Sequence, residues 1–236
     1  MTDPPTPPSA PPPPAPYDDG GAGSYRPRVA LSYGWEKFAD SPATLMVPMI
    51  VVFVGLVVAG LGLEILLVHV PLGSGATGGL LVSGVFSALM FLVYQLLAAG
   101  LYRGALRLVD GGSFAIGELF SGWDKTQVVI ASLLTAGAVG VGTILCVVPG
   151  LVIAFLTQFT LLFVVDRGLP AVDAIRASVR LVTGHLGSTV VFYLLCAAVT
   201  ALGALLCGVG LLVTVPVVLI GYAYTFRRLQ DQPVAG

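Results

Sequence analysis

Charge is scarce in this sequence. Only 10% of the 236 residues are charged, whereas 56% are hydrophobic and the mean hydropathy is +0.96. A water-soluble domain usually carries about 25% charged residues, so the composition excludes that class and indicates an integral membrane protein. The formal net charge is −1, so there is no basic excess to recruit nucleic acid.

Histidine and cysteine are also rare, with two and three residues. His69 and His185 are expected on opposite sides of the membrane, and no carboxylate pair, Ser-His-acid set or Cys/His cluster suggests catalysis or metal binding. The sequence therefore predicts a protein that is not an enzyme and holds no cofactor. Cys146 and Cys207 precede two predicted outer turns and could pair there, although unpaired, buried cysteines are the favoured interpretation.

The N-terminal segment differs from the rest of the chain. Residues 1–28 hold ten of the seventeen prolines, which lack a backbone N–H and oppose helix formation. We expect a disordered cytoplasmic tail with polyproline II character and no signal peptide. The proline run at residues 11–16 is either a solvated spacer or a docking segment for an aromatic groove.

Six apolar runs follow, and most approach the ~20 residues that cross a bilayer. They span residues 45–68, 80–101, 128–147, 151–165, 189–206 and 211–226. Short uncharged turns at 73–79, 148–150 and 208–210 would join them in pairs. The predicted fold is an all-α, polytopic membrane domain over residues 29–230, with six transmembrane helices in three hairpins, followed by a short tail at 231–236.

The basic residues predict the orientation. All eleven Lys and Arg residues precede the first run, follow the last, or lie between the second and third or fourth and fifth. Because basic residues favour the cytoplasmic side, both termini are expected in the cytoplasm, with the protein in the bacterial plasma membrane.

Short interfacial segments precede each predicted hairpin, at residues 30–40, 114–125 and 171–185. The first two contain Trp35 and Trp123, which are expected to anchor at the headgroup level. The third is an amphipathic helix with Val172, Ile175, Val179 and Val182 on one face. Arg176 and Arg180 lie on another face, where they either bind anionic lipid or only fix the topology.

Three polar residues within the predicted crossings are further candidates for function. Glu64 is an ionisable residue in the first crossing, although a hydrated helix end is the favoured interpretation. Gln95 and Gln158 lie near the middle of the second and fourth crossings, where amides usually link helices and less often contact a substrate.

Several motifs resemble known families. Pro149-Gly150, Asp166, Ala174-Ile175 and the stretch 100–106 are similar to six-helix bacterial membrane families of unknown function, and to the membrane domain of some glycerophosphodiester phosphodiesterases. The proline-rich tail resembles that of the proline- and glycine-rich transmembrane proteins of mycobacteria and related actinobacteria. The resemblance implies a fold and a location, but no phosphodiesterase activity, since no such catalytic domain is present.

Two functions remain open. We expect a non-enzymatic scaffold or interaction protein that engages membrane lipids and a protein partner at the proline-rich tail. The alternative is a small transporter for an apolar or lipidic solute, although the crossings hold few of the titratable groups that coupled ion transport requires.

Overall fold

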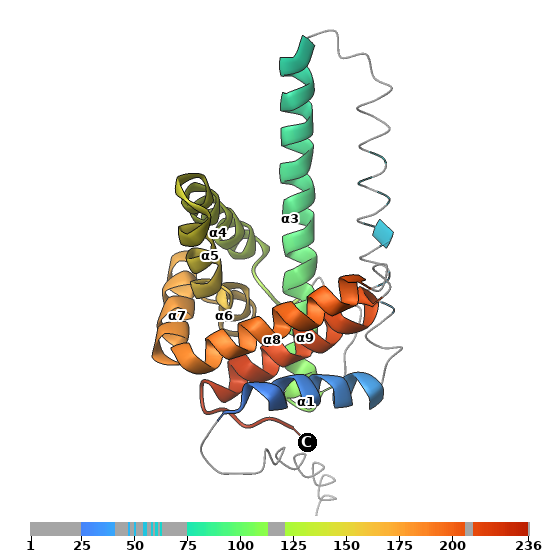
Figure 1. The fold of residues 1–236 in the computed structure, drawn as a ribbon, viewed down its shortest axis with the longest axis vertical. Helices are drawn as coiled ribbons and strands as arrows, with labels where there is room; N and C mark the ends of the chain where they lie inside the picture. Colours follow the sequence, from blue (N-terminus) through green and yellow to red (C-terminus); the bar gives the residue numbers. More distant parts are fainter. Residues whose placement is uncertain are drawn as a thin grey trace, which may run out of the picture.

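The computed structural model describes residues 25–40, 75–112, 121–205 and 210–235, with a few isolated positions between 47 and 62. The regular elements in these ranges are helices (Figure 1): α1 (Pro27–Asp40), α3 (Gly75–Val109), α4 (Lys125–Leu145), α5 (Val147–Leu156), α6 (Thr160–Arg167), α7 (Ala171–Gly184), α8 (Leu186–Leu205) and α9 (Leu211–Arg228). The predicted all-helical fold class is confirmed.

Five stretches of the described chain are long and apolar enough to cross a membrane. They are Val85–Val109 within α3, Lys125–Leu145, Val147–Arg167, Leu186–Leu205 and Leu211–Arg228, and the third combines α5 with α6. These stretches overlap five of the six predicted apolar runs. Most of the first run, at 45–68, lies outside the described residues, so the arrangement of six helices in hairpins stays a prediction.

Helix α9 lies at the centre of the packing. Figure 1 shows α3 upright, with α1, α8 and α9 lying across its lower part and α4 to α7 grouped beside it. α9 contacts α1, α3 and α8, and its side chains Ile220, Tyr224 and Phe226 are almost completely buried. The core is therefore built where these helices cross.

The first predicted interfacial segment belongs to α1, which packs along α9. A glycine permits the close contact, because a Cβ on Gly34 would lie 3.3 Å from the carbonyl carbon of Val217. Tyr33 is fully buried against Tyr224, with 4.8 Å between ring centroids. Trp35 is 56% exposed, so its indole lies at the protein surface.

The connection between α4 and α5 differs from the predicted turn at residues 148–150. α4 ends at Leu145 and α5 begins at Val147, so Cys146 alone links them, in an extended conformation (φ −170°, ψ 145°). Pro149 lies in the first turn of α5, where N–H groups have no intrahelical acceptor and proline is tolerated. The predicted position of the turn is therefore wrong by a few residues.

Helix α7 packs on the protein mainly through small residues. The buried residues are Ala171, Ala174, Ser178 and Val182, whereas Val172 of the predicted apolar face is 48% exposed. Small side chains let α7 approach α6 closely, and hydrogen bonds draw Ser178 inward. Of the predicted apolar face, Val182 is therefore buried in the protein and Val172 stays open, and contact of this face with the membrane stays a prediction.

Candidate functional site

Three charged residues meet where α3, α6 and α9 end. Asp110 directly follows α3, Asp166 lies in the last turn of α6, and Arg227 lies in the last turn of α9. These residues are far apart in sequence, but α3 contacts both α6 and α9. The packing of the helices therefore brings two acids and one base to the same place.

The guanidinium of Arg227 binds both carboxylates. Its Nε and Nη2 donate to Asp110 at 2.9 and 2.7 Å, while Nη1 and Nη2 donate to Asp166 at 2.8 and 2.7 Å. Nη1 also donates to Gln232 Oε1 at 2.9 Å. These bonds use all five N–H donors of the arginine. The side chains of Arg227 and Asp166 are only 11% and 16% exposed, whereas that of Asp110 is 45% exposed.

The segment after α9 is packed beside this cluster. The backbone N–H of Gln232 donates to the carbonyl of Arg227 at 3.0 Å, and that of Ala235 donates to the carbonyl of Val109 at 2.9 Å. The Tyr33 hydroxyl donates to the Ala235 carbonyl at 2.9 Å. The residues predicted as a short C-terminal tail therefore lie against α1 and α3 as far as Ala235.

Asp110 and Arg227 are not among the candidates singled out from the sequence. Part of a usable signal was nevertheless present, because Asp166 and Arg227 directly follow the predicted runs that end at 165 and 226, whereas Asp110 lies nine residues beyond the run that ends at 101. Helices that end on one side bring such groups to a similar depth. Which acid meets which base depends on the helix packing, which the charge pattern does not reveal.

The fourth predicted crossing is interrupted near its middle. α5 ends at Leu156 and α6 begins at Thr160. Ser178 of α7 bridges the gap, because its Oγ donates to the Leu156 carbonyl at 2.8 Å and accepts from the Phe159 N–H at 3.1 Å. An unpaired backbone group is costly at membrane depth. Ser178 therefore stabilises the break.

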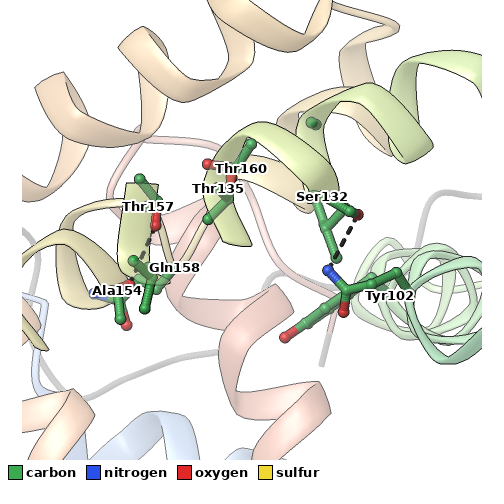
Figure 2. A pocket seen from close by; sticks show the side chains of 11 residues that line it. Tyr102, Ser132, Thr135, Ala154, Thr157, Gln158 and Thr160 are labelled. Carbon is green, nitrogen blue, oxygen red and sulfur yellow. Dashed lines mark hydrogen bonds between the residues drawn. The ribbon is translucent and has the colours of Figure 1, made fainter. Parts of the chain in front are cut away.

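A polar pocket of about 190 Å³ lies beside this break (Figure 2). It brings together Gln95 and Gln158, the two glutamines predicted near the middle of their crossings. Gln95 Nε2 donates to Ser132 Oγ at 3.1 Å, and the Tyr222 hydroxyl donates to Gln158 Oε1 at 3.2 Å. Both amides therefore link neighbouring helices, and both also line the pocket.

The remaining candidates do not join these two sites. Arg176 and Arg180 are exposed on α7, and Arg176 forms a surface ion pair with Asp173 at 3.6 Å. Trp123 is partly buried against the core, and Glu64 lies outside the described residues. Within the described ranges no group of three or more His, Cys, Asp or Glu residues could hold a metal ion.

Comparison with known proteins finds mycobacterial relatives. The chain is 31% identical over 224 residues to the uncharacterized protein Rv2560 of Mycobacterium tuberculosis, a match that covers 87% of this chain and 69% of the relative. The uncharacterized protein Mb2590 of Mycobacterium bovis matches with the same identity and coverage. No family model and no solved structure matches the chain.

Proposed function

The chain belongs to the family of mycobacterial proteins that includes Rv2560, and we propose that it is a non-enzymatic scaffold of the bacterial plasma membrane. In this proposal it crosses the membrane six times in three hairpins, with both termini in the cytoplasm. Support comes from the positions of the eleven Lys and Arg residues, all of which fall on the predicted cytoplasmic side.

The observation that carries the proposal is that the predicted cytoplasmic ends of three helices are bonded to one another. Arg227 joins the ends of α3, α6 and α9, and the segment up to Ala235 packs against the same region. A set of helix ends held in this way offers a stable base from which an interaction segment can extend.

The proline-rich segment leaves this base at a defined point. Tyr25, near the end of this segment, shares a hydrogen bond of 2.7 Å with Thr225 Oγ1 of α9. Burial raises the pKa of the Tyr25 phenol well above its ordinary value, although the bond to Thr225 opposes the shift. The phenol therefore keeps its proton, which the hydrogen bond uses, to a higher pH than an ordinary tyrosine does. The proline run would thus extend from α9 toward a partner.

Lipid contact is the second part of the proposed role. Arg176 and Arg180 are exposed on the same helix, and the Arg180 Nε donates to the Arg176 carbonyl at 3.4 Å. Each basic side chain near an anionic membrane surface contributes about 1 kcal/mol of attraction. These two arginines are therefore the residues proposed to hold α7 against anionic headgroups.

Deleting residues 2–24 should remove the partner while leaving the membrane domain intact. The deletion keeps Tyr25 and its bond to Thr225, so we expect normal insertion and a thermal stability close to that of the full chain. Proteins that are crosslinked to the full chain in cells and recovered in mild detergent should be absent from the material recovered with the deletion variant. The measurement is quantitative mass spectrometry of the crosslinked material, with thermal unfolding of both purified proteins.

A matched variant distinguishes sequence recognition from simple length. Replacing the five prolines at 11–14 and 16 with alanine keeps the length of the segment but removes its polyproline II preference. It should lose the same partners as the deletion. Unchanged crosslinked partners in both variants would contradict the scaffold proposal, and a large loss of thermal stability would show that the segment packs on the helices.

A carrier of neutral solutes is the alternative function. One observation favours it: α5 and α6 are interrupted beside a polar pocket, and interrupted helices often form the binding sites of transporters. A carrier for an uncharged solute would not need a titratable group at the middle of the membrane.

A further inference from the structure

The pocket beside the helix break contains polar atoms with unused hydrogen-bonding capacity. Gln158 Nε2, Thr135 Oγ1 and Thr160 Oγ1 are buried and have no hydrogen-bond partner among the described residues. All three side chains line the pocket, and Figure 2 shows them around it. Thr160 is the most buried of them, with only 3% of its surface exposed.

Three other threonines, of α4, α7 and the end of α5, use their hydroxyls in local hydrogen bonds. Thr143, Thr157 and Thr183 each donate to the carbonyl four residues earlier, at 2.8 Å. For Thr160 that carbonyl belongs to Leu156, which already accepts from Ser178 at 2.8 Å. The backbone N–H of Thr160 donates to Thr157 and not to Leu156, so the break removes the regular i−4 geometry at Thr160, and its hydroxyl lines the pocket without a partner.

The orientation of Gln158 is also fixed. Its Oε1 accepts from the Tyr222 hydroxyl, which leaves the amide Nε2 as a donor at the pocket. An amide N–H₂ group needs an acceptor, and a buried donor without one destabilises the protein. The pocket therefore presents one directed donor and two hydroxyls that can donate.

The chemistry of the lining limits the ligand to a neutral molecule. None of the residues that line the pocket is Asp, Glu, Lys, Arg or His, and a charge without a counter-charge is very costly to bury.

We propose that this pocket binds a small neutral molecule through a carbonyl group, which accepts hydrogen bonds from Gln158 Nε2 and the Thr160 hydroxyl. The apolar lining residues Val139, Ala154 and Leu161 would contact the rest of the molecule. Such a site does not depend on the scaffold role, which rests on the predicted cytoplasmic ends of the helices.

Photolabelling of the full-length protein in detergent tests the site. Benzophenone is a neutral ketone that reacts on illumination with nearby C–H bonds, and the adducts can be mapped by peptide mass spectrometry. We expect adducts on the pocket residues of α4, α5 and α6. Methyl benzoate, which has a carbonyl but is not excited at the wavelength used, should suppress them, whereas tert-butylbenzene, which has no carbonyl and no benzylic C–H, should need about a tenfold higher concentration, equivalent to ~1.4 kcal/mol.

A pair of threonine variants provides the matched control. Thr160→Val removes a free hydroxyl and should lower the labelling several-fold, whereas Thr183→Val, on α7 and outside the pocket, removes one already bonded to Val179 and should leave it unchanged. Gln158→Leu should lower the labelling about tenfold. Equal suppression by methyl benzoate and tert-butylbenzene, or full labelling in both Thr160→Val and Gln158→Leu, would show that the pocket does not recognise a carbonyl group and would overturn the proposal.

Discussion

Replacing Arg227 with leucine is expected to lower the free energy of unfolding by about 3–5 kcal/mol, the usual cost of removing one partner from a buried ion pair. The reason is that Asp166, whose side chain is only 16% exposed, would lose the guanidinium that binds both of its carboxylate oxygens. The segment that carries Gln232 would also lose its bond to the guanidinium.

The two acids should contribute unequally to this effect. Asp110 is 45% exposed and can be hydrated, so Asp110→Asn should cost less than Asp166→Asn. Arg227→Lys should restore only part of the stability, because an ammonium group has three donors and cannot bind both carboxylates in the bidentate manner of a guanidinium.

Arg176→Leu supplies the control for a lost surface charge. Its side chain is 70% exposed and its ion pair with Asp173 is open to solvent, so its removal should cost ~1 kcal/mol or less. The measurement is the unfolding of the purified protein by a denaturing detergent in mixed micelles, monitored by the loss of helicity. Equal stability of the Arg227→Leu and Arg176→Leu variants would contradict the ion-pair cluster.

Replacing Gly150 with valine should separate α4 from α5 and destabilise the protein by about 3 kcal/mol, near the upper end of the usual cost of overpacking. A Cβ at Gly150 would lie 2.8 Å from the backbone nitrogen and 3.0 Å from the Cα of Thr143. These are backbone atoms, which cannot rotate away. On the facing helix, a Cβ at Gly142 would lie 3.0 Å from the Cα of Gly150.

Gly137→Val is the control, because a Cβ at Gly137 of α4 would meet no atom within 4 Å. Both changes place the same β-branched residue in a helix, so their difference isolates the helix contact. We expect the Gly137 variant to unfold at nearly the wild-type detergent concentration. If the two variants unfold alike, the close contact of α4 and α5 is absent.

The sequence predicted the position of a helix correctly where the signal, such as hydrophobicity, extends over many residues. The runs at 128–147, 189–206 and 211–226 are apolar throughout, so helices α4, α8 and α9 could be located without knowledge of their neighbours. Features that depend on one neighbour were missed. The Pro149-Gly150 pair indicates a turn, yet proline also suits a helix start and this glycine serves the contact with Thr143.

The candidate sites show the same division. Gln95 and Gln158 could be selected because a polar amide within an apolar run is conspicuous, and both line the pocket. The pocket itself depends on Ser178, which lies on a different helix and supports the break between α5 and α6. Similarly, Asp110 and Arg227 are ordinary charges at helix ends in the sequence, and they become a cluster only through the packing of α3 against α9.

Accessibility of the two ends of α4 tests the membrane orientation most directly. Cys146 is exposed directly after α4, and Thr126 is exposed in its first turn. One variant keeps Cys146 alone, with Cys196 and Cys207 replaced by alanine, and the other carries Thr126→Cys without native cysteines. With a membrane-impermeant maleimide on intact cells, we predict labelling of Cys146 at once and of Thr126→Cys only after permeabilisation. Labelling of both variants in intact cells, or the reverse pattern, would contradict a crossing by α4 with its Lys125 end in the cytoplasm.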